Sequence, residues 1–253
     1  TSGNDIKLAV GAAGSVHSAG VAGTSNTVLG VDAGIGLEAG SNYNVLIGDL
    51  VGDASMNDAV GNTCVGYSSG GALTTGDYNT FLGRNTGLVS QAVQFAVAIG
   101  NGAMDTGNAT TDANGTVAIG VNALSALTSG AGNLAIGYQA LATHTTGINN
   151  IAIGYQAMHD TDSTASSSAS LTSQGNVIIG KSAGSGAWQD QCNRNIAIGE
   201  LSLSGALVNS SNNICVGYKS GLAITTGDGN TLVGYQAGDV LATGDDNILI
   251  GRD

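Results

Sequence analysis

Titratable side chains that could do chemistry are concentrated in one short stretch of the chain. His159, Asp160 and Asp162 lie close together at the start of a serine-rich segment. An imidazole beside carboxylates is the combination that general acid–base catalysis uses. However, Ser, His and Asp meet by chance in such a segment, and neither a nucleophile-elbow nor a metalloprotease motif accompanies them. The sequence therefore predicts no catalytic residues, and we expect that the chain is not an enzyme.

Aspartates in glycine-containing turns form a second candidate group. Asp77, Asp228, Asp245 and Asp246 lie in such turns and carry oxygens of the kind that Ca²⁺ binds. Their spacing matches neither an EF-hand loop nor a regular calcium-binding repeat. Turn chemistry alone explains them, because Asp hydrogen-bonds readily within its own turn. Calcium therefore stays an alternative, favoured by the net charge of −12, and no other metal or cofactor is predicted.

Two irregular segments suggest a receptor contact. One begins at His159, and the other holds Trp188, the only tryptophan. Binding concentrates in loops on rigid scaffolds, and aromatic faces suit sugars and protein anchors. One hypothesis is that Trp188, His159, Asp160 and Asp162 contact a cell-surface glycan or protein receptor. The alternative is that both segments are surface insertions that the scaffold tolerates.

The composition excludes several classes of protein and partner. Lys and Arg number 6 against 18 for Asp and Glu, so nucleic acid and anionic membranes would be repelled. No apolar run approaches the roughly 20 residues of a membrane span, and no signal-peptide pattern opens the chain. The 42 glycines without any proline exclude collagen, and a hydrophobic fraction of 42% argues against disorder.

A repeated five-residue unit organises the chain and accounts for much of its glycine. The unit reads Asn, two apolar residues, then Ile, Leu or Val, and then Gly; in three copies Lys7, Ala96 or Thr116 replaces the Asn. Most copies follow one another at 17 or 18 residues. The closing glycines are Gly11, Gly30, Gly48, Gly66, Gly83, Gly100, Gly120, Gly137, Gly154, Gly180, Gly199, Gly217, Gly234 and Gly251.

A unit of this length suits one coil of a parallel β-solenoid and is too short for a helix pair or a propeller blade. We therefore predict an all-β fold, a parallel β-solenoid or β-roll of about 14 coils with a repeat of 17–18 residues. The chain is expected to form one repeat domain over residues 1–253, with loop insertions at 104–115, 158–175 and 185–194. It is also expected to be a piece of a longer protein. Its narrow coils explain the recurring Ala and Ser and the few aromatic residues.

The third residue of the unit is apolar in every copy from Asn26 onward. If the second and fourth residues line the inside of the coil, alternation along the strand places the third outside. A continuous apolar stripe of this kind predicts a homo-oligomer packed about it. The stripe residues are Val28, Leu46, Cys64, Phe81, Ala98, Ala118, Ala135, Ala152, Ile178, Ala197, Cys215, Leu232 and Leu249.

Tyrosines recur at one position next to the closing glycine. Tyr138 and Tyr155 occupy equivalent places one coil apart, as do Tyr218 and Tyr235. We expect each pair to stack on itself and cover the coil surface, because neighbouring aromatic residues on adjacent strands pack in this way. The alternative is a tyrosine ladder that binds a polysaccharide.

The repeats resemble two families of trimeric surface protein. The strings NLAIG, NIAIG and TVAIG look like the head domains of trimeric autotransporter adhesins, which are left-handed parallel β-rolls. The longer unit with GYQAL, GYQAM or GYQAG and then TTGDxN more closely resembles repeat regions of phage tail fibres. The adhesin repeat is shorter than 17 residues, so this chain departs from it. The resemblance implies a homotrimer on a virion surface or outside the cell.

The expected function is a structural and adhesive fibre module, the shaft or receptor-binding segment of a phage tail fibre or similar virion appendage. A bacterial trimeric autotransporter adhesin head that binds host matrix or cells is the alternative. An ice-binding or other surface-binding solenoid is a third reading, but ice binding needs a flat array of exposed Thr, and the Thr pairs here lie in turns and skip several coils. The expected partners are further copies of this chain and a cell-surface glycan or protein receptor.

Overall fold

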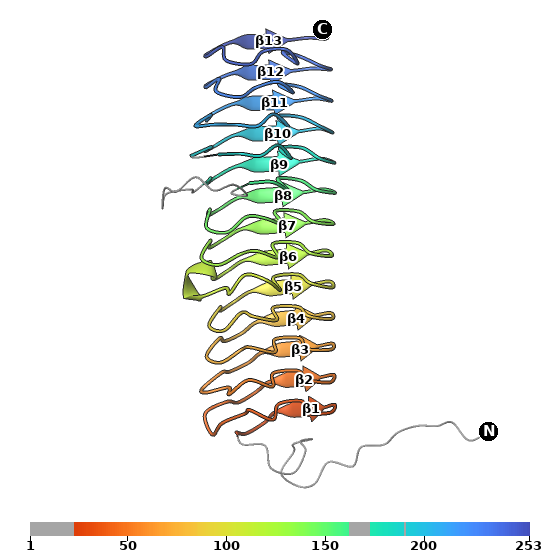
Figure 1. The fold of residues 1–253 in the computed structure, drawn as a ribbon, viewed down its shortest axis with the longest axis vertical. Helices are drawn as coiled ribbons and strands as arrows, with labels where there is room; N and C mark the ends of the chain where they lie inside the picture. The colour runs from red at the N-terminus through yellow and green to blue at the C-terminus, as the bar shows by residue number, and fades with distance from the viewer. Residues whose placement is uncertain (1–22, 162–172, 190) are drawn as a thin grey trace, which may run out of the picture.

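A computed structural model describes residues 23–161, 173–189 and 191–253, which form a stack of short strands with one strand in each coil (Figure 1). One 3₁₀ helix, η1 (Thr111–Ala113), interrupts the irregular chain between strands β5 and β6. The strands are β1 (Thr27–Leu29), β2 (Val45–Ile47), β3 (Thr63–Val65), β4 (Thr80–Leu82), β5 (Val97–Ile99), β6 (Val117–Ile119), β7 (Leu134–Ile136), β8 (Ile151–Ile153), β9 (Val177–Ile179), β10 (Ile196–Ile198), β11 (Ile214–Val216), β12 (Thr231–Val233) and β13 (Ile248–Ile250).

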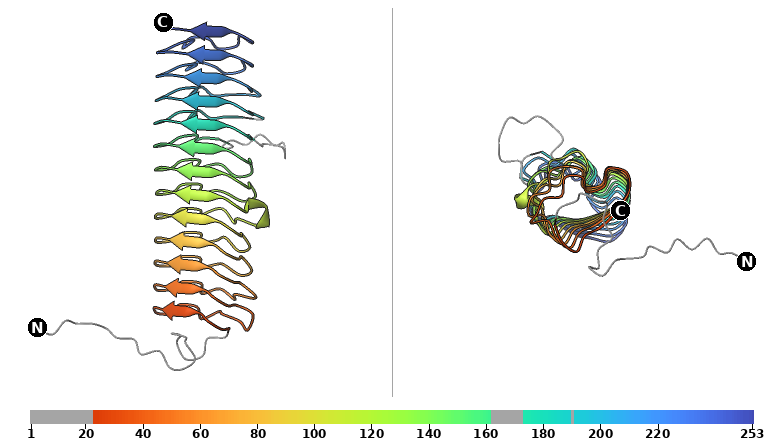
Figure 2. Two further views of the ribbon diagram at one scale, coloured as in Figure 1. Left: turned by 180° about the vertical axis from the view of Figure 1, so that it is seen from behind. Right: turned by 90° about the horizontal axis from the view of Figure 1, so that it is seen from below.

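The strands form one parallel sheet in strict sequence order, from β1 at one end of the stack to β13 at the other. Equivalent residues pair throughout, as Ile151 pairs with Val177 even across the long β8–β9 connection. Seen along the stack, the coils superpose as one closed outline (Figure 2). The predicted all-β parallel solenoid is confirmed, with thirteen strands in the described residues. The copy that ends at Gly11 and residues 162–172 of the 158–175 insertion lie outside them.

An asparagine precedes eleven of the thirteen described strands, and these asparagines form hydrogen-bonded ladders along the stack. All of them except Asn247 are buried, and Ala96 and Thr116 take this place before β5 and β6. Oδ1 of Asn62 accepts hydrogen bonds from the backbone N–H and the Nδ2 of Asn79, both at 3.0 Å. Nδ2 of Asn79 also donates to the Val93 carbonyl at 2.7 Å. Each amide thus joins its own coil to both neighbours, which satisfies polar groups that burial would otherwise leave unpaired. The ladder asparagines are Asn26, Asn44, Asn62, Asn79, Asn133, Asn150, Asn176, Asn195, Asn213, Asn230 and Asn247.

The third residue of the repeat points into the coil, so its predicted exposure as an oligomer stripe is wrong. In most coils its side chain is completely buried, while the second and fourth residues are partly exposed. Leu249 is 41% exposed only because no described coil covers β13. The corrected inner column consists of Val28, Leu46, Cys64, Phe81, Ala98, Ala118, Ala135, Ala152, Ile178, Ala197, Cys215 and Leu232, followed by Leu249.

The asparagine ladder is the physical reason for this orientation. Alternate residues of a strand share a face, so the residue two positions after a buried asparagine also points inward. The small residue three positions after each closing glycine is buried as well, as in Ala33, Ser69 and Ala103. A narrow interior favours small side chains, which explains why five of the inner-column residues are alanine.

The closing glycine allows the chain to leave the strand at a tight corner. All thirteen closing glycines of the described coils have φ between 123° and 143°, a region that side chains other than glycine rarely adopt. A Cβ at Gly83 would lie 2.8 Å from the carbonyl oxygen of Gly100 in the next coil. Glycine is required here by both backbone conformation and close stacking.

Candidate functional site

The predicted receptor-contact residues do not form one exposed site. His159 and Asp160 are partly exposed and paired, with Nδ1 of His159 2.9 Å from Oδ1 of Asp160. Asp162 lies outside the described residues. Trp188 is only 1% exposed, so its predicted role as a receptor contact is wrong.

Trp188 is buried because the irregular segment that carries it completes a coil. Its backbone N–H donates to the Asp160 carbonyl at 3.2 Å, which fixes the segment to the coil below. A Cβ at Gly184 would lie 3.1 Å from both the Trp188 ring and Ile178, so the ring lies against the inner column. The Trp188 side chain therefore fills the interior of its coil, a place that smaller residues fill in other coils.

The sequence did not predict a polar cluster that is buried near this coil. Nδ1 of His144 lies 3.1 Å from Oγ1 of Thr161, and Nε2 lies 3.3 Å from Nδ2 of Asn150. Nδ2 of Asn150 also donates to the Ser173 carbonyl at 2.8 Å. His144 is completely buried, and this arrangement connects adjacent coils rather than facing a substrate.

The turn aspartates bind backbone groups of neighbouring coils. Oδ1 of Asp77 accepts the N–H of Val60 at 2.8 Å, and Oδ1 of Asp245 accepts the N–H of Asp228 at 2.9 Å. These contacts join one coil to the next, whereas the sequence predicts hydrogen bonds within a single turn. In the three described stretches, no three His, Cys, Asp or Glu side chains gather in a group fit to hold a metal ion.

The outer face of the sheet is a continuous surface of one chemical kind. It consists of two columns, the second and fourth residues of the repeat, and we call it the outer sheet face. Every residue in it is Thr, Val, Leu or Ile, and none is charged. β-branched side chains dominate both columns, since they pack well on a pleated surface. The outer columns contain Thr27, Leu29, Val45, Ile47, Thr63, Val65, Thr80, Leu82, Val97, Ile99, Val117, Ile119, Leu134, Ile136, Ile151, Ile153, Val177, Ile179, Ile196, Ile198, Ile214, Val216, Thr231, Val233, Ile248 and Ile250.

The residue after the closing glycine is aromatic or charged in most coils, the exceptions being Val31, Asn101 and Val121. Tyr138 stacks on Tyr155 with ring centroids 5.1 Å apart, which confirms the expected pairing. Tyr218 stacks on Tyr235 at 5.3 Å in the same way. The two pairs are separated by Lys181 and Glu200, whose Nζ and Oε1 atoms are 3.0 Å apart. Each ring therefore covers one face of its partner.

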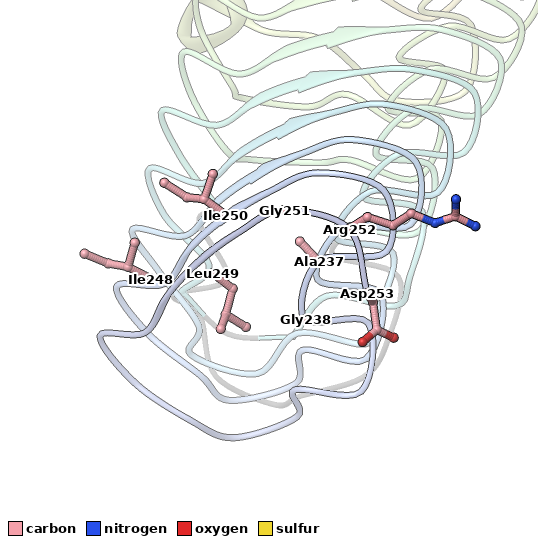
Figure 3. Close-up of a pocket in the computed structure, with 8 residues that line it drawn as sticks. All are labelled: Ala237, Gly238, Ile248, Leu249, Ile250, Gly251, Arg252 and Asp253. Atoms are coloured by element: carbon pink, nitrogen blue, oxygen red, sulfur yellow. The ribbon is translucent and has the colours of Figure 1, made fainter.

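The last coil exposes its interior. Leu249 lies at the mouth of a cavity of about 350 Å³, which Ala237, Gly238 and residues 248–253 line (Figure 3). Ile248 and Ile250 of β13 point away from it and are 73% and 75% exposed. The cavity is the open end of the coil stack, and it contains no convergent set of polar groups.

Three comparisons with known proteins give no relative for this chain. No family model, curated protein or solved structure matches it. The fold itself defines the class, which is a parallel β-solenoid repeat protein. None of the helical turns in the described residues is long and apolar enough to cross a membrane.

Proposed function

We propose that this chain is a structural and adhesive fibre module, a rigid rod that assembles with copies of itself through the outer sheet face. The observation that carries the proposal is the uncharged apolar surface of thirteen rows, in a chain with a net charge of −12. A charged solvent-facing residue would be expected somewhere in so many rows if water covered the face. Large exposed apolar surfaces of this kind mark contacts with another molecule.

The dimensions suit a contact between copies of the chain. Strands about 4.8 Å apart give thirteen rows a length on the order of 60 Å, and two outward side chains in each row give a width of roughly 10 Å. The face therefore offers on the order of 600 Å² per copy, near the lower limit for a specific interface. Rows at the same spacing on both copies let the β-branched side chains interdigitate along the whole length.

A homotrimer is the assembly that we propose, by the resemblance to trimeric tail-fibre and adhesin repeats. The trimer would form a long, stiff rod that presents three copies of a receptor-binding surface. Three equivalent sites on one rod raise avidity without new contacts. The proposed location is a virion appendage. A bacterial adhesin head outside the cell is the alternative, and the solenoid is compatible with both.

Ice binding is disfavoured by the outer sheet face itself. Only four of its residues are threonine, namely Thr27, Thr63, Thr80 and Thr231, and they occupy one column only. A regular threonine array would need to fill both columns.

Sedimentation velocity tests the proposal with charges placed in the fourth-residue column. Ile136→Lys combined with Ile153→Lys puts two cations in adjacent rows and is expected to convert the assembly to monomers at micromolar concentration. The matched control, Thr75→Lys with Thr226→Lys, adds the same charge in exposed turns and is expected to leave the assembly intact. A wild-type chain that sediments as a monomer at this concentration would refute the proposal.

A further inference from the structure

One backbone position in the repeat has a left-handed conformation in every described coil. It is the residue immediately before the ladder position, and its φ lies between 54° and 71° in all thirteen coils. Five of these residues are glycine and two are asparagine, the types that tolerate this region. Three are aromatic, and all three lie in the coils of β2, β4 and β5: Tyr43, Tyr78 and Phe95. Bulky side chains are less common in this conformation than glycine or asparagine, although Arg194 occupies the same position of another coil.

These three side chains form an exposed aromatic patch. Tyr43, Tyr78 and Phe95 are 65%, 56% and 58% exposed. The rings of Tyr78 and Phe95 stack with centroids 5.5 Å apart and an interplanar angle of 10°. The Tyr78 ring also lies over Gly61, because a Cβ there would be 2.7 Å from a ring carbon. Tyr78 and Phe95 lie in adjacent coils, whereas Tyr43 lies two coils from Tyr78, with Gly61 at the position between them. The coils are those of β2, β4 and β5 in Figure 1.

Hydrogen-bonding groups border the patch on one side. Asp77 and Gln94 immediately precede the two stacked rings, and Nε2 of Gln94 lies 3.4 Å from Oδ2 of Asp77. This contact is long, so both groups keep capacity for a ligand.

The charge around the patch favours a neutral ligand. Between Gly23 and Phe95 the only basic residue is Arg84, and its guanidinium lies 5.7 Å from the Tyr67 ring, in the column that follows the closing glycines. Six carboxylates occur in the same span. Anionic polysaccharides, nucleic acids and anionic lipids would therefore meet repulsion with no compensating cation.

We propose that Tyr43, Tyr78 and Phe95, with Asp77 and Gln94 at their border, bind a neutral saccharide chain that runs along the rod. A pyranose ring has an apolar face that packs on aromatic rings and hydroxyl groups that reach a polar border. A patch that repeats along an axis suits a linear polymer better than a compact ligand. The inference rests on the proposed adhesive function and assigns it a site and a class of receptor.

Isothermal titration with neutral hexasaccharides of glucose, N-acetylglucosamine and mannose tests this site. We expect at least one of them to bind the wild-type protein. Tyr78→Gly combined with Phe95→Gly is expected to reduce that affinity by at least about tenfold, since each lost aromatic stack removes a substantial part of the contact. Glycine suits the left-handed backbone, so this variant is expected to unfold at the wild-type temperature or above it.

The matched control is Tyr138→Ala with Tyr155→Ala, which removes a stacked aromatic pair from the other column. It is expected to bind the saccharide like the wild type. Three results would overturn the inference: no hexasaccharide binds, binding survives Tyr78→Gly with Phe95→Gly, or the control loses affinity equally. Sedimentation of the same samples keeps the two proposals separate, because failure to bind leaves the assembly through the outer sheet face unaffected.

Discussion

The two faces of the same thirteen strands follow different packing rules. The inner column is filled by residues that range from alanine to phenylalanine, and all of them except Leu249 are buried. The outer sheet face is uniform, with only Thr, Val, Leu and Ile over its whole length. Inner-column side chains can differ in size because each coil packs its own interior. A contact with a second regular surface requires a uniform outer sheet face.

The largest expected effect is a cavity in the inner column. Phe81 is completely buried, so Phe81→Ala should lower the free energy of unfolding by about 3–5 kcal/mol. Leu82→Ala, one residue further on the outer sheet face, should cost less than about 1 kcal/mol in a dissociated chain. Denaturant unfolding measures both, and equal losses would show that the assigned faces are wrong.

Breaking the asparagine ladder should rank next. Asn62→Ala removes the acceptor of the Asn79 backbone N–H and leaves the Gly76 carbonyl without its 2.8 Å hydrogen bond from Nδ2. We expect a loss of about 2–4 kcal/mol in unfolding free energy, because buried polar groups are left unpaired. Asn101→Ala, at an exposed position outside the ladder, is the control and should change little.

Alkaline pH provides a smaller test of burial in the inner column. Burial raises the pKa of the Cys64 thiol from 9.0 to about 12. In the unfolded chain the Cys64 thiol ionises at a lower pH than in the folded chain. The contribution of the buried thiol to the free energy of unfolding is therefore complete below pH 9 and is lost as the pH rises toward 12. When the pH is raised from 8 to 10, ionisation of the Cys64 thiol in the unfolded chain should lower the free energy of unfolding by about 1.4 kcal/mol. Cys64→Ala should show a correspondingly flatter pH dependence; an unchanged slope would mean that the thiol is not buried.

Much of the fold could be predicted from the spacing of the closing glycines. A regular unit of 17 or 18 residues with one apolar strand fits few architectures other than a solenoid. Strand alternation also showed correctly which residues share a face. It could not show which face is inside, because both are apolar. The deciding signals were the asparagine at the first position, which has the same orientation as the third, and the alanines at Ala98, Ala118, Ala135, Ala152 and Ala197.

The candidate sites were harder to predict because exposure depends on the path of each coil. Trp188 stood in an irregular segment, yet that segment closes a coil around its ring. Conversely, Tyr43, Tyr78 and Phe95 occupied a regular position that drew no attention in the sequence. Their signal was the residue type at a place where most other coils have Gly or Asn, and it becomes evident only once the backbone shows φ near 60°.

The most direct test of the account is the accessibility of a thiol on the outer sheet face. Cys64, Cys192 and Cys215 are buried, so a single Val177→Cys substitution on the outer face of β9 can be followed by maleimide labelling. We expect labelling in the assembled protein to be at least about tenfold slower than in the same variant carrying Ile136→Lys and Ile153→Lys, because a second copy covers the face. Thr226→Cys, in an exposed turn, should react at the same rate in both backgrounds. Equal labelling of Val177→Cys in the two backgrounds would contradict the claim that this face joins copies of the chain.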